Sequence, residues 1–145
     1  MKAPERDYSH RSLGDKLGVV AQARAALVGR HDPWFVDTLN ARLTKPPAIR
    51  LRATYDLIFL RVDGPRDLAA IAPAANRLAP DGALWIVHPK GRGALPRDAE
   101  VRAAALAAGL VDNKISTYGD THTTTRYVVP VVRRKSHAAS TNRRT

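Results

Sequence analysis

Positively charged side chains and histidines stand directly after three apolar runs of this sequence, where their chemistry suits an anion. The three runs end near residues 28, 61 and 88. Glycine alternates with positive charge in Lys90-Gly91-Arg92-Gly93, and such a loop offers backbone amide groups beside the cations. A helix start predicted at Asp32-Pro33 would add the partial positive charge of a helix N-terminus. The residues predicted to bind a small anionic ligand are Gly29, Arg30, Arg61, His88 and Lys90.

No arrangement typical of a catalytic site accompanies these residues. The serines lack a G-x-S-x-G motif, and Lys90 is not part of a phosphate-binding P-loop pattern. His88 would need an orienting partner to act as a general base. His122 could reach over the strand ends from the hairpin loop, but a threonine-rich β-turn explains the residues of that loop equally well. The five histidines show no metal-binding spacing, and the chain has no cysteine. No catalytic residue, metal or cofactor is therefore predicted.

The chain carries a formal charge of +11, and part of the surplus is concentrated at its C-terminal end. Residues 133–145 contain cations and no acidic residue, which predicts a basic, disordered tail. A solvated tail is one interpretation. The alternative is a nucleic-acid-binding accessory module, because clustered cations bind phosphates through counterion release. The residues that would make these contacts are Arg133, Arg134, Lys135, Arg143 and Arg144.

Apolar runs alternate with helical patterns along the first half of the chain. A short helix ends near Gly18, a strand covers residues 25–28, and a second helix starts at Asp32-Pro33, where proline is favoured in the first turn. The next strand covers residues 55–62. Residues 48–52 also alternate like a strand, but a parallel neighbour needs a crossover of about a dozen residues. We therefore expect an extended connector there.

The middle of the chain predicts a helix, a tight turn and a further strand. A helix starts at Gly64-Pro65, is kinked by Pro73 and extends to Leu78, where apolar residues keep helical spacing. Pro80-Asp81-Gly82 has the composition of a turn. A strand is expected over residues 83–88, so the succession indicates a parallel βαβ unit.

The last part of the chain predicts a helix and a hairpin. Pro96 opens the helix and Gly109 closes it in a left-handed conformation. Residues 114–118 and 125–132 predict an antiparallel hairpin at the edge of the sheet, in which Pro130 marks the end of pairing. The strand over residues 125–132, expected at the edge, could pair across a two-fold axis in a homodimer.

Together these elements predict one three-layer α/β domain over residues 1–132. Its sheet has about five strands, most of them parallel, and a C-terminal antiparallel hairpin. The chain has no apolar run long enough to span a bilayer and no signal-peptide pattern at its start, so a cytoplasmic protein is expected.

Several segments resemble the distal half of class I methyltransferases, which have a Rossmann-like fold. These segments are Asp56-Leu57-Ile58, the stretch from Leu78 to Leu84, Ala107-Ala108-Gly109-Leu110-Val111 and the final hairpin. The chain also looks similar to a small bacterial family known as domain of unknown function 3052, which has a reduced version of that fold. This likeness covers about Tyr8 to Val132, and it implies a fold rather than an activity. Its motifs are Tyr8-Ser9-His10, Lys16-Leu17-Gly18, Pro80-Asp81-Gly82 leading to Trp85, and Pro89-Lys90.

The methyltransferase resemblance implies an S-adenosylmethionine site, but its sequence features are missing here. The first turn, from Val28 to Pro33, has one glycine and no G-x-G pattern. The next extended segment is followed by Arg52-Ala53-Thr54, without the acid that binds ribose hydroxyls. The main hypothesis is a non-methylating domain that binds a small anionic ligand or a protein partner at the carboxyl ends of its strands. The alternatives are a nucleic-acid accessory module and an S-adenosylmethionine-dependent methyltransferase.

Overall fold

Residues 13–138 are described by a computed structural model, which has one five-stranded mixed sheet. The strand order is β1-β2-β3-β5-β4, with the first three strands parallel and the last two antiparallel. This arrangement confirms the predicted α/β fold, in which a parallel part of the sheet is followed by a C-terminal antiparallel hairpin. The strands are β1 (Ala25–Val28), β2 (Tyr55–Arg61), β3 (Leu78–Pro89), β4 (Val111–Tyr118) and β5 (His122–Val128).

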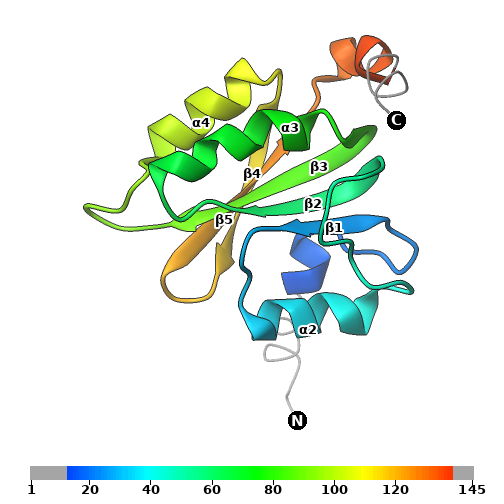
Figure 1. The fold of residues 1–145 in the computed structure, drawn as a ribbon, viewed down its shortest axis with the longest axis horizontal. Coiled ribbons are helices and arrows are strands. Elements are labelled where there is room, and N and C mark those ends of the chain that lie inside the picture. Colours follow the sequence, from blue (N-terminus) through cyan, green and yellow to red (C-terminus); the bar gives the residue numbers. More distant parts are fainter. Residues whose placement is uncertain (1–12, 139–145) are drawn as a thin grey trace.

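Helices cover both faces of the sheet and make three layers (Figure 1). One face is covered by α2 and by a short helix over residues 13–16. The opposite face is covered by α3 and α4. Side chains alternate between the two cores along each strand, as a pleated backbone requires. The helical elements are α2 (Pro33–Arg42), the 3₁₀ helix η1 (Pro65–Ala70), α3 (Ile71–Ala75), α4 (Asp98–Ala107) and the 3₁₀ turn η2 (Val131–Arg133).

The core on the α2 side is centred on β3 and includes a fully buried tryptophan. Trp85 packs with Phe35 and Leu17 in this core, and its indole N–H donates to the Leu17 carbonyl oxygen at 3.1 Å. Burying the ring without leaving an unpaired donor requires such a partner. Trp85 therefore helps hold the N-terminal helix on this face.

The predicted turn between α3 and the following strand is wrong. The helix ends at Ala75, and Leu78 already pairs with Tyr55 as the first residue of β3. Pro80-Asp81-Gly82 is an irregularity within the strand, where the register shifts between Tyr55 and Leu57. A Cβ on Gly82 would lie 2.9 Å from the Asp56 carbonyl oxygen, so glycine allows the close backbone contact.

The C-terminal hairpin lies at the edge of the sheet as predicted, but its strand order differs from the expectation that residues 125–132 form the edge strand. Strand β5 ends at Val128, before Pro130, and lies between β3 and β4. Both of its edges are therefore paired, so it is not the edge strand. At this end of the sheet the edge strand is β4. A bulge between Asp112 and Lys114 disturbs its regular pairing pattern. Formation of a homodimer through an edge strand stays a prediction, and β4 is the strand at this edge that would pair.

Three smaller predictions are confirmed. The N-terminal helix ends before Gly18, which has a φ of 69°. The connector meets β1 only through a parallel bridge from Ala48 to Ala26. Gly109, with a φ of 89°, closes α4 as expected.

The segment predicted as a disordered tail begins with ordered structure. The turn η2 continues as a helix over residues 134–138. Arg134 Nε donates to the Val129 carbonyl oxygen at 3.1 Å, and a ring nitrogen of His137 lies 2.8 Å from the Leu78 carbonyl oxygen. Arg143 and Arg144 lie outside the described residues, as does Tyr8-Ser9-His10. Among the described residues, no helix is long and apolar enough to cross a membrane.

Candidate ligand site at the carboxyl ends of the strands

The carboxyl ends of β1, β2 and β3 meet at one edge of the sheet because the three strands are parallel (Figure 1). Val28 pairs with Leu60, and Arg61 pairs with Val87, so the residues that follow each strand start at a common level. Ligands of open α/β sheets bind at such an edge. The turn between β4 and β5 reaches the same place, because His122 pairs with Pro89.

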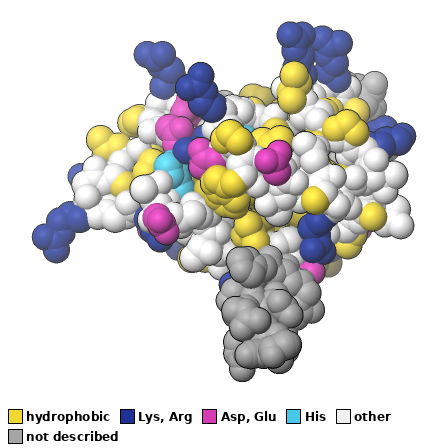
Figure 2. All heavy atoms as spheres, turned by 90° about the horizontal axis from the view of Figure 1, so that it is seen from below, with side chains coloured by type: hydrophobic (Ala, Val, Ile, Leu, Met, Phe, Trp, Pro, Cys, Tyr) yellow, Lys and Arg dark blue, Asp and Glu magenta, His cyan; other side chains and the backbone are white. Residues whose placement is uncertain are grey.

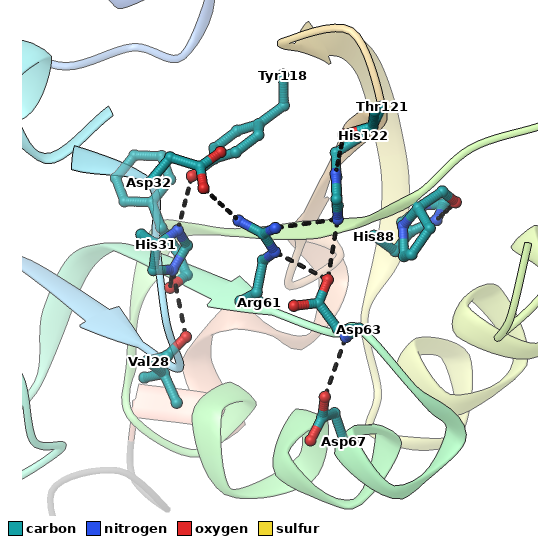
Figure 3. A network of polar contacts seen from close by, with 12 residues as sticks. Val28, His31, Asp32, Arg61, Asp63, Asp67, His88, Tyr118, Thr121 and His122 are labelled. Atoms are coloured by element: carbon teal, nitrogen blue, oxygen red, sulfur yellow. Dashed lines mark hydrogen bonds and ion pairs between the residues drawn. The ribbon is translucent and has the colours of Figure 1, made fainter. Parts of the chain in front are cut away.

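Arg61 is at the centre of a polar network at this edge (Figure 3). Its Nε donates to Asp63 Oδ1 at 2.9 Å, and its Nη2 lies 3.1 Å from His122 Nε2. Asp32 Oδ1 lies 3.8 Å from Nη1 on the other side. The Arg61 side chain is only 11% exposed, whereas those of Asp32 and Asp63 are about half exposed. The guanidinium charge is therefore compensated within the protein. We call Asp32, Arg61, Asp63, Tyr118, His122 and His31 the Arg61 cluster.

Electrostatics stabilise the charged forms of both ion-pair partners. Burial acts against the charge of Arg61, but the hydrogen bond and the negative charge of Asp63 raise its pKa above the usual value. Burial likewise opposes the Asp63 carboxylate, while hydrogen bonds from Arg61 and His122 lower the Asp63 pKa. Burial raises the pKa of Tyr118 to about 12, so its hydroxyl stays protonated. The Arg61 guanidinium carbon lies 5.6 Å from the centre of the Tyr118 ring.

His31 fills the space between the ends of β1 and β2. Its Nε2 lies 2.9 Å from the Phe59 carbonyl oxygen and 3.2 Å from the Val28 carbonyl oxygen. Since carbonyl oxygens only accept, Nε2 carries the proton and Nδ1 accepts from the Tyr118 hydroxyl at 3.0 Å. Burial lowers the His31 pKa, which keeps the ring neutral. The ring also stacks on Phe35, with centroids 5.5 Å apart.

Gly29 is explained by the approach of Arg61. It has a φ of 88°, and a Cβ at this position would lie 3.0 Å from the Arg61 Cβ. A glycine is therefore required by the protein's own packing, with no need for a bound cofactor. Arg30, the next residue, is exposed and has no ion pair with a described residue.

Arg61 and His88 leave the sheet on opposite faces. Arg61 lies on the α2 side with Phe59, whereas His88 lies on the α4 side with Ile86. His88 is 2% exposed, and its Nδ1 is 3.2 Å from the Pro89 carbonyl oxygen and 3.5 Å from Asp98 Oδ1. Burial lowers the His88 pKa. The five residues predicted to form one site therefore share an edge but not a face.

The loop after β3 contains cations without internal partners. Lys90 and Arg92 are exposed and have no ion pair with a described residue. The Lys90 backbone N–H donates to the Thr121 carbonyl oxygen at 3.1 Å, which ties the loop to the β4-β5 turn. Gly91 and Gly93 have φ values of 103° and 80°. A hollow of about 590 Å³ lies along this loop, lined by Pro89, Gly91, Gly93, Ala94, Leu95, Pro96, Arg97, Asp98 and Ala99.

Sequence reasoning missed most partners of Arg61. Asp32 was expected only as a helix cap, yet its side chain makes no cap bond and faces Arg61 and Trp34 instead. Asp63 and Tyr118 were not considered as site residues. His122 does reach over the strand ends from the hairpin loop, and its contact with Asp63, 59 positions away, has no counterpart in a local sequence pattern.

The surface on the α2 side has a mixed charge. Figure 2 shows an exposed patch of histidine atoms between acidic and basic side chains. Further basic side chains project at the periphery of this face. Within residues 13–138, no group of three or more histidines and acids has a metal-binding arrangement.

The basic residues near the C-terminus make few contacts. Arg133 Nη1 lies 3.5 Å from the Gly109 carbonyl oxygen, and Lys135 is exposed. Their predicted role in nucleic-acid binding stays a prediction.

Comparisons with known proteins give a fold but no family. No protein-family model matches the sequence, and no curated protein matches it. Among solved structures, magnesium protoporphyrin IX methyltransferase from Synechocystis PCC 6803 superimposes with a TM-score of 0.58 at 13% identity, covering 86% of this chain and 79% of that one. A TehB-like S-adenosylmethionine-dependent methyltransferase from Corynebacterium glutamicum has a TM-score of 0.54 at 14% identity, with 86% and 94% covered. The ribosomal protein L11 methylase from Lactobacillus delbrueckii has a TM-score of 0.55 at 11% identity, with 88% and 80% covered.

The fold is therefore that of Rossmann-like methyltransferases. At these identities the likeness concerns the backbone arrangement alone, because one fold hosts many functions. The three neighbours are methyltransferases, the class of the alternative hypothesis rather than of the main one. At the edge itself, His31 fills the space between β1 and β2, and Gly29 packs against Arg61.

Proposed function

We propose that this chain is a methyltransferase-fold domain that binds a small anionic ligand at the loop after β3 and does not transfer methyl groups. The observation that carries the proposal is the contrast in charge compensation along the edge. Arg61 is enclosed by Asp32, Asp63 and His122, whereas Lys90 and Arg92 have no ion-pair partner among the described residues.

The loop has the features that an anion site needs. Lys90 and Arg92 supply positive charge at the loop. The hollow along the loop has Arg97 and Asp98 as its charged lining residues and is large enough for a phosphate- or carboxylate-bearing molecule. Backbone amide groups near Gly91 and Gly93 provide further donors. Arg30 follows the edge strand β1, two strands away from β3, and would add a third, more distant cation.

Thermal unfolding in increasing sodium sulfate tests this proposal. Sulfate should raise the melting temperature of the wild type by more than sodium chloride of equal ionic strength does. Lys90→Ala combined with Arg92→Ala should abolish this excess, and Arg30→Ala on its own tests whether that residue takes part. Lys45→Ala combined with Arg50→Ala removes the same charge from exposed positions elsewhere and should leave the excess unchanged. An equal excess in all variants would refute the site.

A second candidate function is S-adenosylmethionine-dependent methyl transfer, which the structural neighbours favour. Binding would require His31 to leave its place between β1 and β2, breaking its bonds to Val28, Phe59 and Tyr118. Isothermal titration calorimetry with S-adenosylmethionine and S-adenosylhomocysteine tests this candidate. One-site binding to the wild type would make it the better hypothesis. Binding to the His31→Ala variant but not to the wild type would support a site that the His31 side chain blocks.

A further inference from the structure

Three polar side chains form a continuous line of hydrogen bonds at the turn between β4 and β5 (Figure 3). Thr121 Oγ1 lies 2.8 Å from His122 Nδ1, and His122 Nε2 lies 2.9 Å from Asp63 Oδ1. Because a carboxylate only accepts, Nε2 carries the proton and donates it to Asp63. Nδ1 is then the acceptor for the Thr121 hydroxyl. The order of hydroxyl, imidazole and carboxylate is that of an activated nucleophile.

The surroundings of the three groups suit this order. Thr121 is exposed, whereas the side chain of His122 is 14% exposed. The carboxylate of Asp63 also accepts from Arg61 Nε, and its backbone N–H donates to Asp67. Burial opposes the charge of Asp63, but hydrogen bonds from Arg61 and His122 lower its pKa, so it is ionised at neutral pH. An accessible hydroxyl thus lies in front of a base that is oriented from behind.

Arg61 does not interrupt this line. Its Nη2 lies 3.1 Å from His122 Nε2, but a guanidinium nitrogen is itself a donor and cannot accept the ring proton. When the His122 ring takes up a second proton, both groups are positively charged. Asp63 Oδ1 lies 2.9 Å from a nitrogen of each, so one carboxylate stabilises both charges.

The loop after β3 offers donors beside the Thr121 hydroxyl. The Lys90 backbone N–H donates to the Thr121 carbonyl oxygen at 3.1 Å, so the loop adjoins this residue. Within residues 13–138, no group accepts from the backbone N–H groups of Gly91 and Arg92. These amide groups and the two exposed cations of the loop are available to stabilise negative charge on a carbonyl oxygen under attack.

We propose that Thr121 is a nucleophile that takes an acyl group from an activated carboxylic ester, with His122 as its general base. Oγ1 forms a bond to the ester carbonyl carbon while its proton passes to His122 Nδ1. The bond from that carbon to the leaving oxygen breaks, and the oxygen departs with the electron pair. The imidazolium then gives its proton to the leaving group or to solvent. Water attacks the acyl-threonine by the same route, which releases a carboxylic acid and restores the hydroxyl.

Reaction with p-nitrophenyl acetate at pH 7 tests this proposal. Cleavage after Lys114 and Arg126 releases peptide 115–126, which contains Thr121 and no lysine, so its acetylation is separate from that of lysine side chains. Mass spectrometry of acid-quenched samples should find an acetyl group on Thr121. If water removes this group quickly, release of p-nitrophenolate should instead continue beyond one equivalent and depend on Thr121. Absence of both results would overturn the proposal, as would acetylation of Lys90 without either.

Three variants separate the nucleophile and its base from a general effect. Thr121→Val removes the hydroxyl at an exposed position and should abolish the acetylation and the release that depends on it. Thr117→Val is the matched control, because it removes another exposed hydroxyl from the same peptide, and it should change neither. His122→Asn should slow the reaction about a hundredfold. Circular dichroism verifies that each variant is folded. An unchanged reaction in Thr121→Val would overturn the nucleophile, and the wild-type rate in folded His122→Asn would overturn the base.

Discussion

The Arg61 cluster and the loop after β3 lie at the same edge of one sheet but differ in how their charges are used. In the cluster, each charged or polar group faces another group of the protein, and the central guanidinium is 11% exposed. In the loop, Lys90 and Arg92 face solvent beside a hollow. Position at the ligand edge is therefore insufficient to make a residue available to a ligand. Its charge must also be uncompensated.

Under the proposed function, the Arg61 cluster stabilises the fold and the loop after β3 binds the ligand. Substitutions in the cluster should mainly lower stability, because they leave buried polar groups without partners. Substitutions in the loop should mainly change ligand binding, because exposed charges contribute little to folding.

The largest expected effect is that of Arg61→Met. The variant keeps the apolar stem but removes the charge that compensates Asp32 and Asp63 and contacts His122. Because both carboxylates are about half exposed, we expect a loss of about 2 kcal/mol of unfolding free energy, below the value for fully buried pairs. Urea unfolding at pH 7 measures it. Lys90→Met is the matched control and should cost less than about 0.5 kcal/mol. Equal losses for the two variants would remove the distinction between the regions.

A pair of glycine substitutions compares the backbones of the two regions. Gly29→Ala forces a side chain into a positive φ and against Arg61, so it should cost about 2 kcal/mol. Gly91→Ala meets the same kind of strain, but a Cβ there has nothing within 4 Å, so it should cost only about 1 kcal/mol. Denaturant unfolding ranks the two. The reverse order would mean that Arg61 yields easily and that the cluster is not tightly packed.

The pH dependence of stability should come from the buried histidines rather than from the loop. Burial lowers the pKa of His31 and of His88 below 6.5, so the unfolded chain binds more protons just below that pH. Stability should therefore fall as the pH is lowered from 7 through 6.5 towards the folded-state pKa values. Asp63, whose pKa is lowered, adds stability that is lost only as the pH falls below its ordinary value of 3.8.

Unfolding measured between pH 7 and 5 checks this expectation. His31→Asn combined with His88→Asn should be less stable at pH 7 but should lose less stability on acidification. Lys90→Ala should keep the wild-type dependence. A double variant that retains the full dependence would contradict the assignment to these two rings.

The smallest effect concerns the basic C-terminal residues. If they bind nucleic acid, removing residues 139–145, which include Arg143 and Arg144, should reduce the salt dependence of binding. The slope of log affinity against log salt should fall by about 0.9 per phosphate contact on duplex DNA. Fluorescence anisotropy with a short duplex measures it. An unchanged slope would exclude these residues as contacts.

Much of the fold could be predicted because its strands are strongly apolar. Residues 25–28 and 55–61 have to be buried, and the intervening helix is marked by Asp32-Pro33. The boundary near Leu78 was missed because an apolar residue at helical spacing also fits a strand start. Pro80-Asp81-Gly82 has the same composition in a turn and in a strand irregularity, and only the contact with Asp56 decides between them.

The candidate site could be predicted only in part. Parallel strands bring the residues after each run to one edge, and this placement followed from the order of the elements. The face of each side chain depends on its register, which separates Arg61 from His88. The charge of Arg61 is compensated by Asp32 and Asp63, and Asp63 in turn accepts from His122, which the antiparallel hairpin brings from 59 positions away. No local pattern in the sequence reports either fact.

The most direct test of the account is an amide chemical-shift titration of the ¹⁵N-labelled protein with sodium sulfate and, separately, with S-adenosylmethionine. We expect sulfate to shift the amide signals of residues 90–98 and to leave those of residues 28–36 and 61–63 unchanged. S-adenosylmethionine should not shift the signals of residues 28–36. Saturable shifts at 28–36 and 61–63 with S-adenosylmethionine, without a sulfate response at 90–98, would contradict the account.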